Sequence, residues 1–208
     1  MPDGRTIAGL LLVLGPVLGL IPVANPRLMR IWSMSRDDHV TTVGANRRGW
    51  LLLNAGFGVA TIATSAALGI LAVGWDGGTG PRAGLTAGAI AYGIGGALWC
   101  AVLSARARTT PALADLIAAG AAREPAASLL GATLGGVFQG FVIATAAALI
   151  AIGLALAAGG GVAAVIAWLA VVTGIVAIGV LVWTGDLVPA VLYPCTVLIG
   201  IALLAGWA

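Results

Sequence analysis

Six long stretches of this chain contain no charged residue. They cover residues 6–23, 50–73, 84–104, 129–157, 162–183 and 187–207. An α-helix needs about 20 apolar residues to cross a hydrocarbon core roughly 30 Å thick. A helix also satisfies its backbone hydrogen bonds internally, as lipid requires. The pattern therefore predicts an all-α polytopic membrane protein, a bundle of six transmembrane helices.

The composition leaves little material for a domain in water. Charged residues make up 8% of the 208 residues and hydrophobic residues 61%, whereas soluble domains carry about 25% charged residues. We therefore expect residues 1–208 to form a single integral membrane domain with short loops. The chain is rich in alanine, glycine and arginine and has no lysine, which is typical of a high-GC bacterium. These features together predict the bacterial cytoplasmic membrane as its location.

The arginines favour alternate connections between the apolar stretches, and all ten basic residues are arginines. Arg5 precedes the first stretch, Arg27, Arg30, Arg36, Arg47 and Arg48 follow it, Arg82 lies in the second connection, and Arg106, Arg108 and Arg123 lie in the third. Connections rich in basic residues stay in the cytoplasm. We therefore expect the first and third connections inside and both termini outside.

Two of these connections carry signals for short helices at the membrane surface. Asn25 and Pro26 form a helix-start signal, a capping residue followed by proline, and Thr110 and Pro111 repeat it in the third connection. Each segment could instead continue a neighbouring span. Tryptophans at or beyond span ends are Trp32, Trp50, Trp75, Trp183 and Trp207. Such positions predict an aromatic belt at the interface.

The sequence predicts no metal or cofactor. The only histidine is His39, so the chain cannot supply two histidines to haem. Cys100 and Cys195 lie in different spans without the spacing of a zinc site. No Asp, Glu, Lys, Arg or His lies in the spans, which disfavours ion-coupled transport through a buried carboxylate. Basic residues are not interleaved with aromatic ones, so we expect no nucleic-acid partner.

Uncharged polar side chains within the spans are candidates for a ligand site. The residues predicted to line a pocket that opens inward are Asn54, Tyr92, Gln139 and Tyr193, with Arg47 and Arg48 at its mouth to meet an anionic group. A buried amide without a partner costs several kcal/mol. The same side chains could therefore form interhelical hydrogen bonds, each worth roughly 0.6–2 kcal/mol.

Three aspartates are the candidate catalytic residues. Asp37 and Asp38 are adjacent in the first connection, and paired carboxylates can hold Mg²⁺ against a substrate phosphate. A solvated turn explains the same pair. Asp186 lies between the last two predicted spans, where it could instead cap the final helix.

These features leave three functions open. The first is a small permease or exporter for a neutral, apolar or amphiphilic solute. The second is an enzyme embedded in the membrane that acts on a lipid or isoprenoid at the cytoplasmic face. The third is a non-catalytic subunit that packs against another membrane protein. The expected partners are membrane lipids, a small apolar or amphiphilic ligand, and a second copy or another membrane protein.

Overall fold

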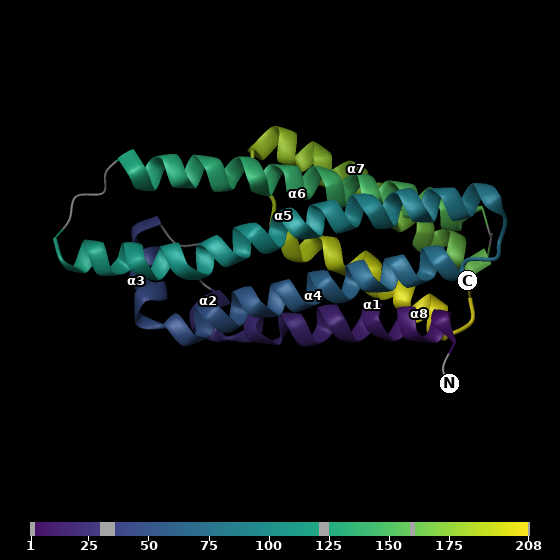
Figure 1. Cartoon of the computed structure of the whole chain (residues 1–208), viewed down its shortest axis with the longest axis horizontal. Helices are drawn as coiled ribbons and strands as arrows, with labels where there is room; N and C mark the ends of the chain where they lie inside the picture. The colour runs from purple at the N-terminus through teal and green to yellow at the C-terminus, as the bar shows by residue number, and fades with distance from the viewer. Residues whose placement is uncertain (1–2, 30–35, 121–124, 159–160, 208) are drawn as a thin grey trace.

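The computed structural model describes residues 3–29, 36–120, 125–158 and 161–207, and none of these lies in a strand. The prediction of an all-α fold is confirmed. The helices are α1 (Gly4–Leu20), η1 (Ile21–Ala24), α2 (Pro26–Met29), α3 (Arg36–Ala45), α4 (Arg47–Gly74), α5 (Thr79–Ala118), α6 (Pro125–Ala157), α7 (Gly161–Thr184), η3 (Pro189–Leu192) and α8 (Tyr193–Leu204) (Figure 1).

In the described part of the chain, 4 helices are long and apolar enough to cross a membrane. They are α4, α5, the segment Gly131–Ala157 of α6 and the segment Ala163–Thr184 of α7. The first and last apolar helices, Gly4–Leu20 and Pro189–Leu204, are shorter. The chain thus has the helices of an integral membrane protein, and the count of six spans stays a prediction.

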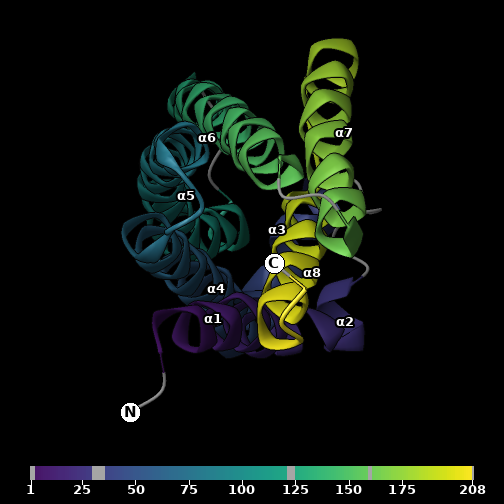
Figure 2. The same cartoon turned by 90° about the vertical axis from the view of Figure 1, so that its right-hand side faces the viewer.

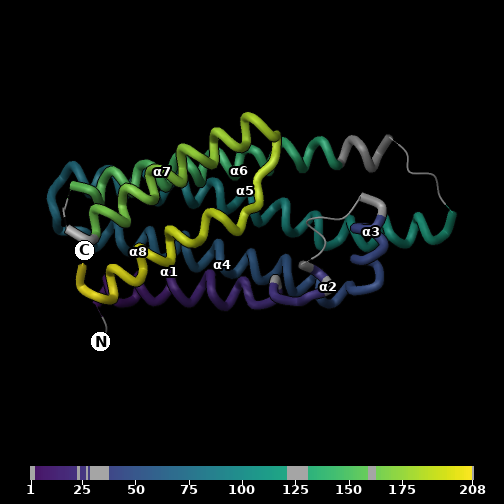
Figure 3. Tube along the Cα trace, turned by 180° about the vertical axis from the view of Figure 1, so that it is seen from behind, coloured from purple at the N-terminus to yellow at the C-terminus, as the bar shows by residue number. Residues whose placement is uncertain are grey.

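The long helices form a closed ring. Each of α1, α4, α5, α6, α7 and α8 packs against the next, and α8 returns to contact α1. Figure 2 shows this ring end-on, with α7 standing farthest from its centre. Successive helices run in opposite directions, so both termini lie at one end of the bundle, and α2 and α3 lie at the other (Figures 1 and 3).

Glycines allow the helix axes to approach closely at several crossings. A Cβ added to Gly19 of α1 would collide with the carbonyl oxygen of Gly56 in α4, and the reverse also holds. A Cβ added to Gly200 of α8 would lie 2.9 Å from the carbonyl oxygen of Gly9 in α1. In lipid, helices associate largely by van der Waals packing, which small residues at the crossing improve.

The two connections with helix-start signals differ. In the first, α2 begins at Pro26 and α3 covers Arg36–Ala45. In the third, no new helix begins at Thr110, because α5 runs without interruption through Pro111 to Ala118. The helix α3 packs along this part of α5, and Arg47 pairs with Asp115. These contacts explain why the segment continues α5 rather than forming a separate helix.

Candidate functional site

Aromatic side chains from four helices fill the middle of the ring. Trp99 of α5 stacks on Phe141 of α6, with ring centroids 4.9 Å apart, and Phe138 lies 5.6 Å from Trp99. Phe57 of α4 meets Trp99 edge-on at 6.0 Å and stacks on Tyr193 of α8 at 6.3 Å. Phe57, Trp99, Phe141 and Tyr193 are each at most 2% exposed. The ring therefore has a packed aromatic interior.

Three of the predicted ligand residues lie in this interior. The hydroxyls of Tyr193 and Thr61 are 2.8 Å apart, which joins α8 to α4. Tyr92 of α5 is buried at 2% exposure. Asn54 is buried on α4, where its Nδ2 donates to the carbonyl oxygen of Trp50 at 2.7 Å. Among the described residues, its Oδ1 has no hydrogen-bond partner.

The structure places Gln139 elsewhere. It lies on an exposed side of α6, whereas Phe141 is buried and Phe138 is partly buried. A helix turns about 100° per residue, so neighbouring positions face different directions. Gln139 thus does not share the interior with Asn54, Tyr92 and Tyr193.

The predicted charged residues are spread over the end of the bundle that carries α3. Arg47 is bound to Asp115 by two hydrogen bonds, one of them 3.1 Å long, and this pair joins α4 to the extended part of α5. Arg48 and Asp38 are exposed. The side chain of Asp37 lies outside the described residues. The pairing with Asp115 leaves Arg47 less available for an anionic ligand.

A compact cluster at the same end surrounds Trp50. This tryptophan is 1% exposed, in contrast to Trp183 at 90%, so it lies within the protein rather than in an aromatic belt. Its Nε1 donates to the carbonyl oxygen of Arg106 at 3.0 Å. The Arg106 guanidinium carbon lies 5.1 Å from the centre of the Trp50 ring. His39 meets the ring edge-on at 5.5 Å.

The cluster changes the protonation of His39. Burial of the imidazole, and secondly the positive charge of Arg106, lower the pKa of His39 below its ordinary value. Both causes disfavour the imidazolium form. His39 is therefore neutral at pH 7, and Arg106 is the positive charge beside Trp50.

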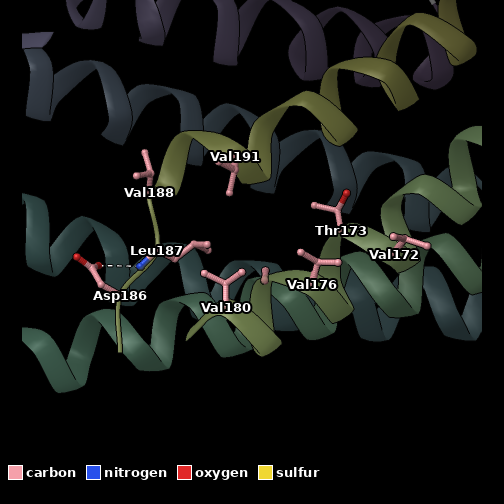
Figure 4. Close-up of a pocket in the computed structure, with 9 residues that line it drawn as sticks. Val172, Thr173, Val176, Val180, Asp186, Leu187, Val188 and Val191 are labelled. Atoms are coloured by element: carbon pink, nitrogen blue, oxygen red, sulfur yellow. Dashed lines mark hydrogen bonds between the residues drawn. The ribbon is translucent and has the colours of Figure 1, made fainter. Parts of the chain in front are cut away.

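A groove of about 620 Å³ lies between α7 and the start of the last helical segment. It is lined by Val172, Thr173, Val176, Ala177, Val180, Asp186, Leu187, Val188 and Val191. Figure 4 shows Asp186 at one end of this row, with Thr173 and Val172 towards the other. The Thr173 hydroxyl is 3.1 Å from the Cys195 thiol of α8. The groove is thus an apolar surface with few polar groups.

Asp186 holds the turn at the end of this groove. Gly185 has a φ of +74°, which ends α7 in a conformation that favours glycine. The Asp186 carboxylate then accepts a hydrogen bond of 2.7 Å from the backbone N–H of Leu187. The N-cap of η3 is Val188, so Asp186 stabilises the turn and not the first turn of the helix. Asp186 also interacts electrostatically with Arg106.

Sequence reasoning missed the groove valines and the cluster at Trp50. The valines resemble those of any apolar span. Trp50 and Arg106 are far apart in the chain and show no shared motif. Within the described ranges, no three His, Cys, Asp or Glu side chains lie close enough to hold a metal ion. Neither the sequence nor the structure matches a known protein family, a curated protein or a solved structure.

Proposed function

We propose that this protein is a membrane carrier that takes up an amphiphilic molecule from the lipid phase through the groove beside α7. The observation that carries this proposal is the groove itself. Its volume of about 620 Å³ falls within the range of roughly 300–1,000 Å³ that is usual for small-molecule sites. Valines form most of its lining, and Asp186 lies at one end. An apolar tail with a polar head matches this arrangement.

The position of α7 supports movement of the bound molecule. Its contact with α8 is the least extensive between neighbours in the ring. Much of its remaining surface is exposed, including Trp168 and Ile175. The Thr173 hydroxyl in the groove and the Cys195 thiol join these two helices, and a displacement of α7 from α8 would separate the two groups and extend the groove between the helices. This seam gives a lateral route from lipid towards the interior of the ring.

The carrier would cross the membrane six times, with both termini outside the cytoplasm. The 17 residues of α1 and the 4 residues of η1 add up to about 33 Å of helix. The 4 residues of η3 and the 12 of α8 make about 26 Å. These lengths are close to the roughly 30 Å of the hydrocarbon core. In this arrangement α2 and α3 lie at the cytoplasmic interface.

The two alternatives have less support. An enzyme that uses Asp38 and Asp186 would need these carboxylates at one site, and the groove includes Asp186 alone. Its phosphate-binding arginines would be Arg47 and Arg48, and Arg47 already pairs with Asp115. A subunit role needs a partner-specific surface, and exposed apolar helix faces are equally expected beside lipid.

A groove-filling variant tests the proposal. Val176→Trp places an indole in the groove, whereas Val182→Trp alters an 81% exposed position of α7 that does not line it. We expect Val176→Trp to abolish binding and proteoliposome export of a fluorescent single-chain amphiphile. Val182→Trp should retain both. If Val176→Trp folds and still binds and exports the probe like the parent protein, the groove is not the site.

A further inference from the structure

We infer that the amphiphile carries a zwitterionic head group, with a phosphate bound by Arg106 and a primary ammonium bound by Asp186. This inference rests on the proposed function, because the tail of the same molecule would occupy the groove beside α7. A phospholipid of the phosphatidylethanolamine type has this chemistry. The argument depends on the surroundings of the two charged side chains.

Arg106 presents a guanidinium with open hydrogen-bonding capacity. It is partly buried at the end of the bundle that carries α3. Its guanidinium lies over Trp50, and within the described residues it forms no ion pair or side-chain hydrogen bond. Trp50 is held in place by its own hydrogen bond to the Arg106 carbonyl. A planar guanidinium on a fixed aromatic surface is well suited to bind a phosphate through two parallel hydrogen bonds.

Asp186 presents the complementary charge at the groove. Its side chain is exposed, and one oxygen accepts the hydrogen bond from the Leu187 N–H. The carboxylate retains further acceptor capacity, because an ionised carboxylate has about four lone-pair sites. Asp186 is near enough to Arg106 for their charges to interact. The two nevertheless form no ion pair in the part of the chain that the structure describes.

This separated pair of charges favours a head group with both signs. A ligand with only a phosphate would be attracted by Arg106 and repelled by Asp186. A purely cationic ligand would be attracted by Asp186 and repelled by Arg106. His39, the other titratable group beside Trp50, is neutral and adds no charge. A phosphate next to an ammonium satisfies both side chains at once. The apolar groove that begins at Asp186 then accommodates an acyl chain.

The test is a lipid titration of the purified protein in detergent, followed by native mass spectrometry. The probes are phosphatidylethanolamine, phosphatidylglycerol with the same acyl chains, and soluble phosphoethanolamine. We expect the first lipid to bind about tenfold more tightly than the second, since a hydrogen-bonded charged group contributes about that factor. Tight binding of phosphoethanolamine without a tail would instead identify a water-soluble ligand and overturn the lipid assignment.

Substitutions separate this inference from the proposed function. We expect Arg106→Gln to weaken phosphatidylethanolamine binding about tenfold or more, Arg106→Lys to weaken it less, and Asp186→Asn to remove the preference over phosphatidylglycerol. Arg108→Gln, at an exposed position on the same helix, is the matched control. Equal binding of the two lipids by the parent protein, or equal effects of Arg106→Gln and Arg108→Gln, would overturn the inference. If Val176→Trp still abolishes binding in that case, the proposed function stands.

Discussion

His39 reports on the charge cluster around Trp50, and it is the only histidine of the chain. Its pKa lies below the ordinary value of 6.5 because the ring is partly buried and because Arg106 is close. Arg106→Gln removes the second cause, so the pKa of His39 should rise and yet remain below 6.5. Nuclear magnetic resonance of protein labelled at histidine measures this titration from a single resonance. A pKa that stays constant in Arg106→Gln would contradict the arrangement of this cluster.

The same shift makes folding stability depend on pH. Folded His39 binds its proton less readily than His39 in the unfolded chain, so the unfolded state takes up more protons as the pH falls below 6.5. The contribution of His39 to stability is therefore present above this pH and is lost progressively below it. Thermal unfolding in detergent at several pH values measures the effect, and His39→Gln should flatten the dependence.

Single residues also show what the sequence could reveal about the site. Because a buried amide without a partner is costly, the sequence suggested that Asn54 either holds two helices together or faces a ligand. In the structure its hydrogen bond stays within α4, and no other described residue forms a hydrogen bond with its buried Oδ1. Tyr193 forms the interhelical bond instead, to Thr61. Residue type indicated which side chains needed partners, but not which partners the fold would supply.

At the scale of helices, the crossing of α1 and α4 depends on two glycines. A Cβ on Gly56 would collide with the Gly19 backbone, whereas a Cβ on Gly58, half a turn away, would have nothing within 4 Å. We expect Gly56→Ala to destabilise the protein by about 1–3 kcal/mol, as overpacking usually does. Gly58→Ala should be neutral or slightly stabilising, because alanine is the better helix former. Chemical unfolding in mixed micelles compares the two variants. Equal stabilities would show that the helices are not in close contact there.

The sequence predicted the positions of most of the long helices. The apolar stretches 50–73 and 84–104 fall within α4 and α5, and 129–157 falls within α6. The sequence left the extension of α5 beyond the apolar stretch open, because Thr110 and Pro111 can begin a new helix and the segment can also continue the span. Its helical form depends on contacts with α3, such as Gly44 against Ala114. Such contacts join segments that are distant in the chain, and local sequence patterns do not predict them.

In the molecule as a whole, both termini lie at one end of the bundle, and α2 and α3 lie at the other (Figure 3). The excess of arginine at the second end predicts that this end faces the cytoplasm. We therefore expect alkaline phosphatase fused after Trp207 to be active, and the same enzyme inserted after Gly120 to be inactive. Fluorescent protein fusions at the two positions should give the opposite pattern. An inactive phosphatase at Trp207 would reverse the orientation or change the number of spans.

The arrangement of the site was the feature that the sequence predicted least well. Periodicity locates apolar stretches along the chain, yet every span here is apolar on nearly all sides. The rotation of each helix about its axis is therefore undetermined by pattern alone. This rotation places Gln139 outside the ring and Trp50 inside it. It also directs Val176 of α7 into the groove.

The close contact between Gly9 and Gly200 has a consequence for biosynthesis. About 190 residues separate the two glycines, and a ribosome needs roughly 10–40 s to make them at 5–20 residues per second. During that interval the face of α1 that later receives α8 is without this partner. The ring of described helices closes only once α8 has been made, so the contact between α1 and α8 forms later than the contact between α1 and α4.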